Sequence, residues 1–171
     1  MTDYRTIPPE GQFDSHACWA ACLAWWLRAV RGGRPSWTQT QVITEYDRHT
    51  DDSGGFPPER LLEVWRADRR LKIDGGVFAT RSWRTGRMPL GEAPVIIAFN
   101  YPTIGGSHMH VLFGYGSEGH ARTMTAMEPY FPYPGRDGQR TGRFEAQTVD
   151  FYIRDSRNVL LFWPKGQMRG G

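Results

Sequence analysis

Apolar residues recur at helical spacing through the first third of the chain. Over residues 17–30 they follow the i, i+3, i+4 stripe of an amphipathic helix, which the glycines at 32–33 are expected to end. The capping-box spacing at residues 36–39 predicts a second helix that continues to about residue 49. A third helix is predicted to begin near Pro58, because proline is favoured in the first helical turn.

Short apolar runs replace the helical pattern in the second half. They lie at residues 94–101, 109–115, 122–127 and 158–163. Runs of this length, bounded by turn residues, predict strands, and Tyr115 is expected on the inward side of its strand. The Pro- and Gly-rich stretch 130–142 is expected to be a loop.

This order of elements predicts an α+β fold for a single domain over residues 1–171. A helical subdomain is expected over about 1–90 and an antiparallel β subdomain over about 91–165, with a frayed tail at 166–171. A groove between two such halves is a common place for a functional site.

Composition narrows the functional class. The 171 residues are 39% hydrophobic and 23% charged, as in soluble globular proteins, and no apolar run approaches the roughly 20 residues of a membrane helix. The first ten residues lack the apolar segment of a Sec signal peptide, which predicts a cytoplasmic protein or one exported by a specialised secretion system. The net charge is +3, with arginines and acids interleaved over 59–70, so neither a nucleic acid nor a membrane is an expected partner.

The chain has two cysteines, Cys18 and Cys22, which are too few for a disulfide framework. Cys18 stands at the start of the first predicted helix, just outside its apolar stripe. The unpaired N–H groups and partial positive charge of a helix N-terminus favour the nucleophilic thiolate there. Cys22 lies within the stripe and is expected in the core.

Further residues stand at fixed distances from Cys18. Gln12 precedes it by six residues, and Trp19 and Ala20 follow it directly. Far downstream, His108 opens a predicted strand in which a Gly-Tyr-Gly run begins six residues later, at 114–116.

Together with the run Gly54-Gly55-Phe56-Pro57, these residues resemble the papain-like cysteine proteases over about residues 11–129. The resemblance implies a papain-like fold with a catalytic cleft between the two halves. It also implies that Cys18 is the nucleophile, His108 its partner and Gln12 an oxyanion donor, with no cofactor and no metal. The residues then expected to contact substrate are Gly54, Gly55, Trp19 and His110.

The third catalytic position departs from the papain pattern. The interval of 90 residues from Cys18 to His108 is shorter than in papain and resembles the compact bacterial members of the superfamily. Those members have an Asp-Pro pair on the next strand, where this chain has Glu128 followed by Pro129. Glu128 is therefore expected to orient the imidazole through Nδ1–H, with Asn100 and Asn158 as weaker candidates.

His108 and His110 are two residues apart and so share one face of their strand. The spacing to the Gly-Tyr-Gly run favours His108 as the partner of Cys18, and His110 is expected to line the site or to pack beneath it.

The resulting prediction is a thiol protease or isopeptidase, suited to a bacterial effector or toxin. Its partners would be a peptide or protein substrate and a cognate immunity or inhibitor protein. Two alternatives stay open. One is a papain-like acyl transferase or amidase with the same Cys–His chemistry, and the other is a zinc-binding module that uses Cys18, Cys22, His108 and His110.

Overall fold

The computed structural model describes the whole chain except residues 1–2, 84–92, 103–105, 119–120, 130–141 and 168–171. Its α-helices are α1 (Cys18–Val30), α2 (Gln39–Tyr46), α3 (Pro58–Ala67) and α4 (Val149–Ile153). Its strands are β1 (Ile73–Ala79), β2 (Val95–Tyr101), β3 (Gly106–Glu118), β4 (Ala121–Glu128), β5 (Arg143–Thr148) and β6 (Asn158–Pro164). The strands form one antiparallel sheet in the order β1-β6-β2-β3-β4-β5, so the predicted α+β class is confirmed.

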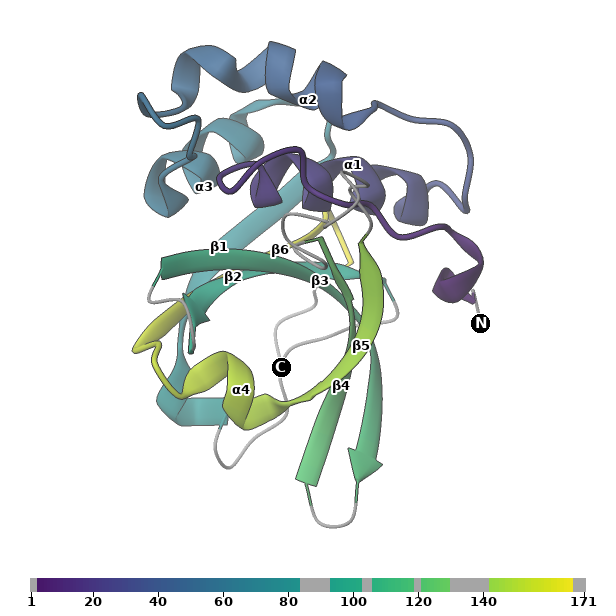
Figure 1. Cartoon of the computed structure of the whole chain (residues 1–171), viewed down its shortest axis with the longest axis vertical. Helices are drawn as coiled ribbons and strands as arrows, with labels where there is room; N and C mark the ends of the chain where they lie inside the picture. The colour runs from purple at the N-terminus through teal and green to yellow at the C-terminus, as the bar shows by residue number, and fades with distance from the viewer. Residues whose placement is uncertain (1–2, 84–92, 103–105, 119–120, 130–141, 168–171) are drawn as a thin grey trace.

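The three longer helices form a layer on one side of the curved sheet, and α4 lies on the other side (Figure 1). Helix α1 sits innermost and contacts both α2 and the strands β2 and β3. All of its residues except Arg28 and Val30 are buried, so it is enclosed on every side rather than along the single predicted stripe. It ends as predicted, because Gly32 and Gly33 adopt positive φ angles and the Gly33 N–H caps the Arg28 carbonyl.

Helix α2 begins later than predicted. Its capping box is formed by Thr38 and Gln41, two residues beyond the Ser36–Gln39 pair that has the same spacing. Helix α3 begins at Pro58, as expected.

The sheet is buried on both faces, which divides the core in two. In β2, Ile96 and Ala98 pack in the cluster beneath the helical layer, whereas Val95, Ile97 and Phe99 pack in a second cluster with α4. This double burial explains why β2 has a continuous apolar run instead of an alternating one.

Three elements were not predicted. Strand β1 lies inside the predicted helical half and pairs with β6, and β5 and α4 follow the stretch that was expected to be a loop. β1 contains Gly75, where a Cβ would come within 2.8 Å of the Leu161 carbonyl oxygen, so close strand packing takes the place of an apolar pattern. Most of the predicted loop and most of the predicted tail fall outside the described residues.

Strand β3 carries a bulge between Leu112 and Gly114. The extra residue interrupts the inward–outward alternation of side chains. Tyr115 is consequently 48% exposed rather than inward as predicted.

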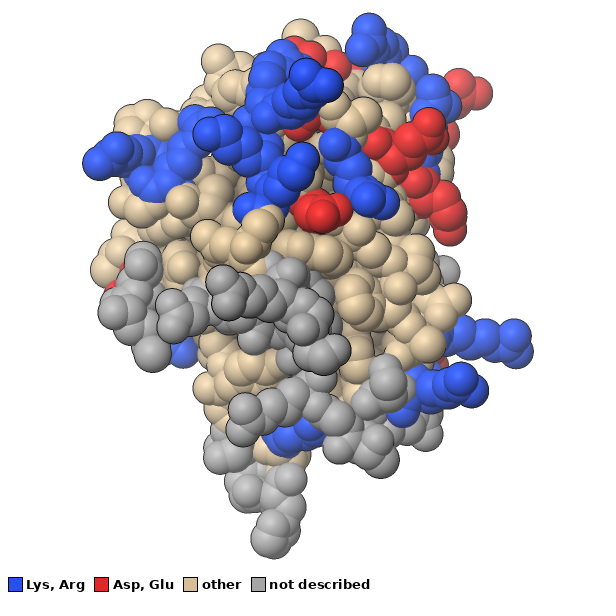
Figure 2. All heavy atoms as spheres, turned by 180° about the vertical axis from the view of Figure 1, so that it is seen from behind, with Lys and Arg blue, Asp and Glu red and all other residues tan. Residues whose placement is uncertain are grey.

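No helix among the described residues is both long and apolar enough to span a bilayer. On the face seen in Figure 2, Lys and Arg side chains gather over the helical layer with Asp and Glu side chains beside them. Among the described residues, ion pairs join Arg66 of α3 to Asp74 at 3.0 Å and Arg70 to Glu45 of α2 at 2.6 Å. Neighbouring carboxylates thus offset part of the positive charge.

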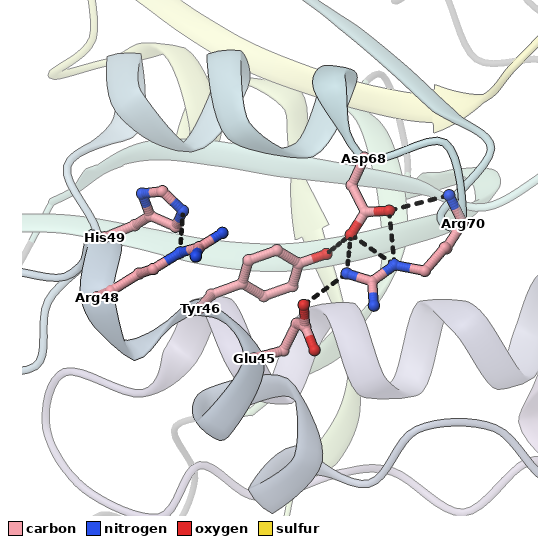
Figure 3. A network of polar contacts seen from close by, with 6 residues as sticks. All are labelled: Glu45, Tyr46, Arg48, His49, Asp68 and Arg70. Atoms are coloured by element: carbon pink, nitrogen blue, oxygen red, sulfur yellow. Dashed lines mark hydrogen bonds and ion pairs between the residues drawn. The ribbon is translucent and has the colours of Figure 1, made fainter.

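A polar network joins α2 to the segment after α3 (Figure 3). The Tyr46 hydroxyl donates to Asp68 Oδ2 at 2.7 Å, and the Arg70 guanidinium binds the same carboxylate and also Glu45. Hydrogen bonds from Arg70 and Tyr46 outweigh the effect of burial and lower the pKa of Asp68 to about 2. Ionised Asp68 therefore fastens α2 in place.

We expect Tyr46→Phe to lower the free energy of unfolding by about 1.5–3 kcal/mol at pH 7, because it removes one hydrogen bond to a charged group. A lowered pKa stabilises the fold above the unfolded value near 3.8 and loses that effect as pH falls through about 2. Urea unfolding at pH 7 and pH 2 measures both. An equal loss at the two pH values would contradict the proposed dependence on ionised Asp68.

Candidate functional site

The site begins where the N-terminal end of α1 meets β3. The Cys22 thiol donates to the Met109 carbonyl oxygen at 3.2 Å, which fixes the helix against the strand. One helical turn earlier, Cys18 reaches the preceding residues of β3, and its side chain hydrogen-bonds with His108. Cys18 is the first residue of the helix, where backbone N–H groups have no acceptor within the helix, and its exposed fraction is 9%.

Glu128, the last residue of β4, holds the other side of the His108 ring. His108 Nε2 lies 2.8 Å from Glu128 Oε1, and both side chains are buried. The sequence prediction placed this carboxylate at Nδ1, which is wrong: Glu128 meets Nε2, and Nδ1 is the nitrogen left for Cys18. The reason is one of position, since Cys18 on α1 and Glu128 on β4 approach the ring from opposite sides.

The electrostatics of the site favour an ion pair. Burial lowers the pKa of His108, but hydrogen bonds and charge interactions with Cys18 and Glu128 outweigh burial and raise it to about 9. Burial raises the pKa of Glu128, yet the two neighbouring imidazoles, His110 foremost, hold it well below its usual range. An imidazolium beside an ionised carboxylate is therefore the resting arrangement at neutral pH.

We expect the His108 imidazole to titrate near pH 9 instead of the ordinary value of about 6.5. A raised pKa stabilises the fold fully below about pH 6.5 and loses that effect as pH rises through about 9. NMR of the imidazole Cε1–H follows the titration, and Glu128→Gln should shift the midpoint to lower pH. A midpoint at or below 6.5 in the unaltered protein would refute this assignment.

His110 is fully buried behind Glu128 and does not reach the surface. Its Nε2 lies 2.6 Å from Glu128 Oε2, a short but bent contact, and its Nδ1 lies 3.2 Å from the Tyr152 hydroxyl. The expectation that His110 contacts substrate is therefore wrong. The side chain packs beneath the site, against Glu128 and Tyr152. Glu128 thus has one imidazole on each of its oxygens.

Gln12 lies in the segment that leads into α1. Its backbone N–H donates to the Pro129 carbonyl, which places it beside the end of β4, and its side-chain amide donates to the Asp14 carbonyl at 2.6 Å. Gln12 is 4% exposed, and its Oε1 has no hydrogen-bond partner among the described residues. One of its two amide N–H bonds is thus engaged within the segment, and the second N–H is the one that an oxyanion could use.

Trp19 and the Gly54–Gly55 loop are bound to one another. The Trp19 indole N–H donates to the Gly54 carbonyl at 3.2 Å, and the ring packs edge-on against Phe56. Asp51 closes the loop, because its Oδ1 accepts from the Gly55 N–H and its own N–H donates to the Gly55 carbonyl. The backbone groups that were expected to pair with a substrate therefore already have partners, the Gly55 groups in Asp51 and the Gly54 carbonyl in Trp19, and buried Trp19 holds the loop against α1.

The weaker candidates for the third position lie elsewhere. The Asn100 side chain is exposed and donates to the Asp155 carbonyl, and Asn158 is exposed at the start of β6. Among the described residues, Glu128 is the side chain bound to His108 Nε2.

The structure does not bring the four predicted zinc ligands together. Burial raises the pKa of the Cys22 thiol well above its usual value, and this thiol is occupied by the Met109 carbonyl. The described residues that could share a metal ion are instead His108, His110 and Glu128, whose ligand atoms lie within 4.8 Å of one another. Two of the nitrogen–oxygen distances are 2.8 and 2.6 Å, shorter than the roughly 3.3 Å that separates two ligand atoms each about 2 Å from a tetrahedrally bound ion.

Sequence reasoning missed three residues that complete the cluster. Tyr152 on α4 contacts His110, and Glu145 on β5 lies 3.7 Å from His110 Nδ1 and pairs with Arg143 at 2.8 Å. None of them stands in a recognisable motif. The alternation of β5 could have suggested that one charged residue points inward, but not toward which partner.

A separate hollow of about 1220 Å³ lies at the opposite end of α1, between Tyr4, Val30 and Phe113. None of the described residues that line it is a cysteine or a histidine. The chemistry is therefore assigned to the Cys18 site.

No protein-family model matches this chain, and no curated protein matches it.

Proposed function

We propose that this chain is a papain-like thiol hydrolase that cleaves a peptide or isopeptide bond through Cys18. The observation that carries the proposal is the buried chain Cys18–His108–Glu128, in which a thiol at a helix N-terminus, an imidazole and a carboxylate are joined by hydrogen bonds. Nucleophile, base and orienting group in this order are the general pattern of an activated nucleophile.

In the proposed reaction, the Cys18 thiolate attacks the acyl carbon and forms a tetrahedral intermediate. The Cys18 N–H and the second amide N–H of Gln12 are suited to bind the oxyanion. The His108 imidazolium then protonates the leaving nitrogen as the C–N bond breaks, which leaves a thioester on Cys18. Water attacks the thioester with His108 as base, releasing the carboxylic acid and restoring the thiolate–imidazolium pair.

The raised pKa of His108 supports this order of reaction steps. The imidazolium must survive at neutral pH until the leaving group needs its proton, and the raised pKa of His108 meets that need. Ionised Glu128 holds Nε2 of the His108 ring, and the ring also hydrogen-bonds with Cys18.

The first test is selective alkylation of the whole chain with iodoacetamide at pH 6. An ordinary thiol, with a pKa near 8.5, is less than about 1% thiolate at that pH. We expect Cys18 to be modified rapidly while Cys22 stays unmodified until the protein unfolds, because Cys22 is fully buried and bound to a carbonyl. Peptide mapping separates the two sites. Slow and equal labelling of both cysteines would contradict an activated thiolate.

The second test identifies the reaction. The protein is incubated with a peptide library in the presence and absence of a primary amine, and new termini and new amides are read by mass spectrometry. Hydrolysis gives free carboxyl termini in both samples. Amides formed only with the added amine would indicate the acyl transferase alternative, and no product with either would count against both.

A further inference from the structure

The Glu128 carboxylate binds a second histidine that the proposed reaction does not use. His108 occupies Oε1 at 2.8 Å, and His110 lies 2.6 Å from Oε2. All three side chains are nearly or completely buried. A buried imidazole with no substrate within reach needs a separate explanation.

The geometry defines which nitrogen of His110 carries the proton. An ionised carboxylate oxygen only accepts hydrogen bonds, so a nitrogen 2.6 Å away must bear a hydrogen, since two lone pairs at that distance would repel. In a neutral imidazole, the other nitrogen is then an acceptor. His110 Nδ1 is matched by a donor, the Tyr152 hydroxyl, at 3.2 Å.

The surroundings of Tyr152 keep its hydroxyl protonated, so that it can donate a hydrogen bond to His110 Nδ1. It lies on the short helix α4, is fully buried, and packs edge-on against the rings of Phe99 and His110. Burial raises the pKa of its hydroxyl well above the usual value, so the hydroxyl keeps its proton.

The other acceptor near Nδ1 is too far away to compete. Glu145 Oε1 lies 3.7 Å from Nδ1, beyond hydrogen-bond distance, and Arg143 holds the other oxygen of Glu145 at 2.8 Å. The His110 ring therefore has a short, bent Nε2 contact toward Glu128 and an Nδ1 hydrogen bond with Tyr152.

We propose that Tyr152 and His110 are positioning residues: the Tyr152 hydroxyl holds His110 in its Nε2–H tautomer, and His110 holds Oε2 of Glu128 so that Oε1 of the same carboxylate orients His108. This rests on the proposed function for its catalytic consequence, but the tautomer and the clamp are properties of the resting protein. The clamp matters because a carboxylate held by one imidazole alone could rotate away from His108.

Several titratable or charged groups face His110 and Glu128 from the surrounding elements. They are Cys18 and Cys22 on α1, Tyr101 on β2, His108 on β3, Arg143 and Glu145 on β5, and Tyr152 on α4. A pH profile of the site must therefore be read together with a direct measurement on His110.

The direct measurement is the ¹⁵N spectrum of histidine-labelled full-length protein at pH 7, with the His110 signals identified from their loss in His110→Gln. We expect the proton on Nε2 in the unaltered protein and a mixture of tautomers in Tyr152→Phe. Phe151→Leu is the matched control, because it alters a ring stacked on His110 in the same helix without removing a hydrogen bond to it. The Nδ1–H tautomer, with no proton on Nε2, would overturn the proposal.

The consequence for the site is measured as the rate of Cys18 alkylation against pH. We expect Tyr152→Phe to slow it several-fold at pH 6 and to shift the profile to higher pH. We expect a loss of roughly 10- to 100-fold in His110→Leu, as for other partners that orient a reactive group. His110→Gln should recover most of the rate, since the glutamine Nε2 can donate to Glu128 in place of the imidazole.

The outcomes separate this inference from the proposed function. If peptide turnover is found but Tyr152→Phe alters neither tautomer nor alkylation profile, the positioning role is wrong and the hydrolase proposal stands. If tautomer and profile respond as expected but no acyl substrate is turned over, the clamp stands and the hydrolase proposal fails.

Discussion

Cys18→Ala should abolish turnover, because no second nucleophile occupies its place at the N-terminus of α1. His108→Ala should be nearly as severe, since nucleophile and base act as a unit and their losses are not additive. The expected reduction in kcat is on the order of 10⁴-fold or more for either variant, as for other catalytic pairs of this kind. The measurement is kcat on a substrate taken from the peptide library, with circular dichroism to verify folding.

The chain offers a matched control for each variant. Cys22→Ala removes the other cysteine of the same helix and should retain activity, at the cost of a small cavity and one hydrogen bond to Met109. His16→Ala removes an exposed histidine two residues before Cys18 and should change little. Undiminished activity in a folded Cys18→Ala variant would end the hydrolase proposal.

Glu128→Ala should have the largest effect on stability. It would leave two buried imidazoles without their shared carboxylate, and removal of one partner from a buried ion pair costs about 3–5 kcal/mol. Glu128→Gln keeps the volume and one acceptor oxygen, so it should cost less while still lowering the pKa of His108. Urea unfolding at pH 7 gives the free energies of both variants.

Two controls test whether the loss of stability in Glu128→Ala comes from the buried carboxylate: its dependence on pH, and the effect of breaking the partly exposed Glu10–Arg28 pair. Because the pKa of Glu128 is lowered in the folded state, its contribution is present above the unfolded value near 4.5 and should disappear as pH falls through and below that value. Glu10→Gln breaks the partly exposed pair of Glu10 with Arg28 and should cost no more than about 1 kcal/mol. Similar losses for Glu128→Ala and Glu10→Gln would show that the buried cluster has no special role.

Glu128 is more important in the structure than the sequence alone indicates. From sequence, Glu128 is one of three candidates for orienting His108, and its loss would only let the ring move. In the structure it joins two imidazoles and lies 1% exposed, so its loss would also leave buried groups without a partner. Burial and the second contact cannot be read from the Glu-Pro pair alone.

The sequence by itself determined the features that depend on neighbours along the chain. The apolar period of α1 and the glycines after it set where that helix lies, so Cys18 could be assigned to its start. The two-residue period of a strand likewise put His108 and His110 on one face. Local backbone geometry fixes both relationships, whatever the rest of the fold does.

Only the tertiary structure decided how distant segments meet. The register that sets Val111 of β3 opposite Met127 of β4 brings Glu128 between the two histidines, and the packing of five-residue α4 brings Tyr152 to His110. These contacts join residues 18 to 42 positions apart, and a helix of one turn has no periodicity to reveal which way a side chain points. The pairing nitrogen of His108 was mispredicted for the same reason, since it depends on the directions from which α1 and β4 approach the ring.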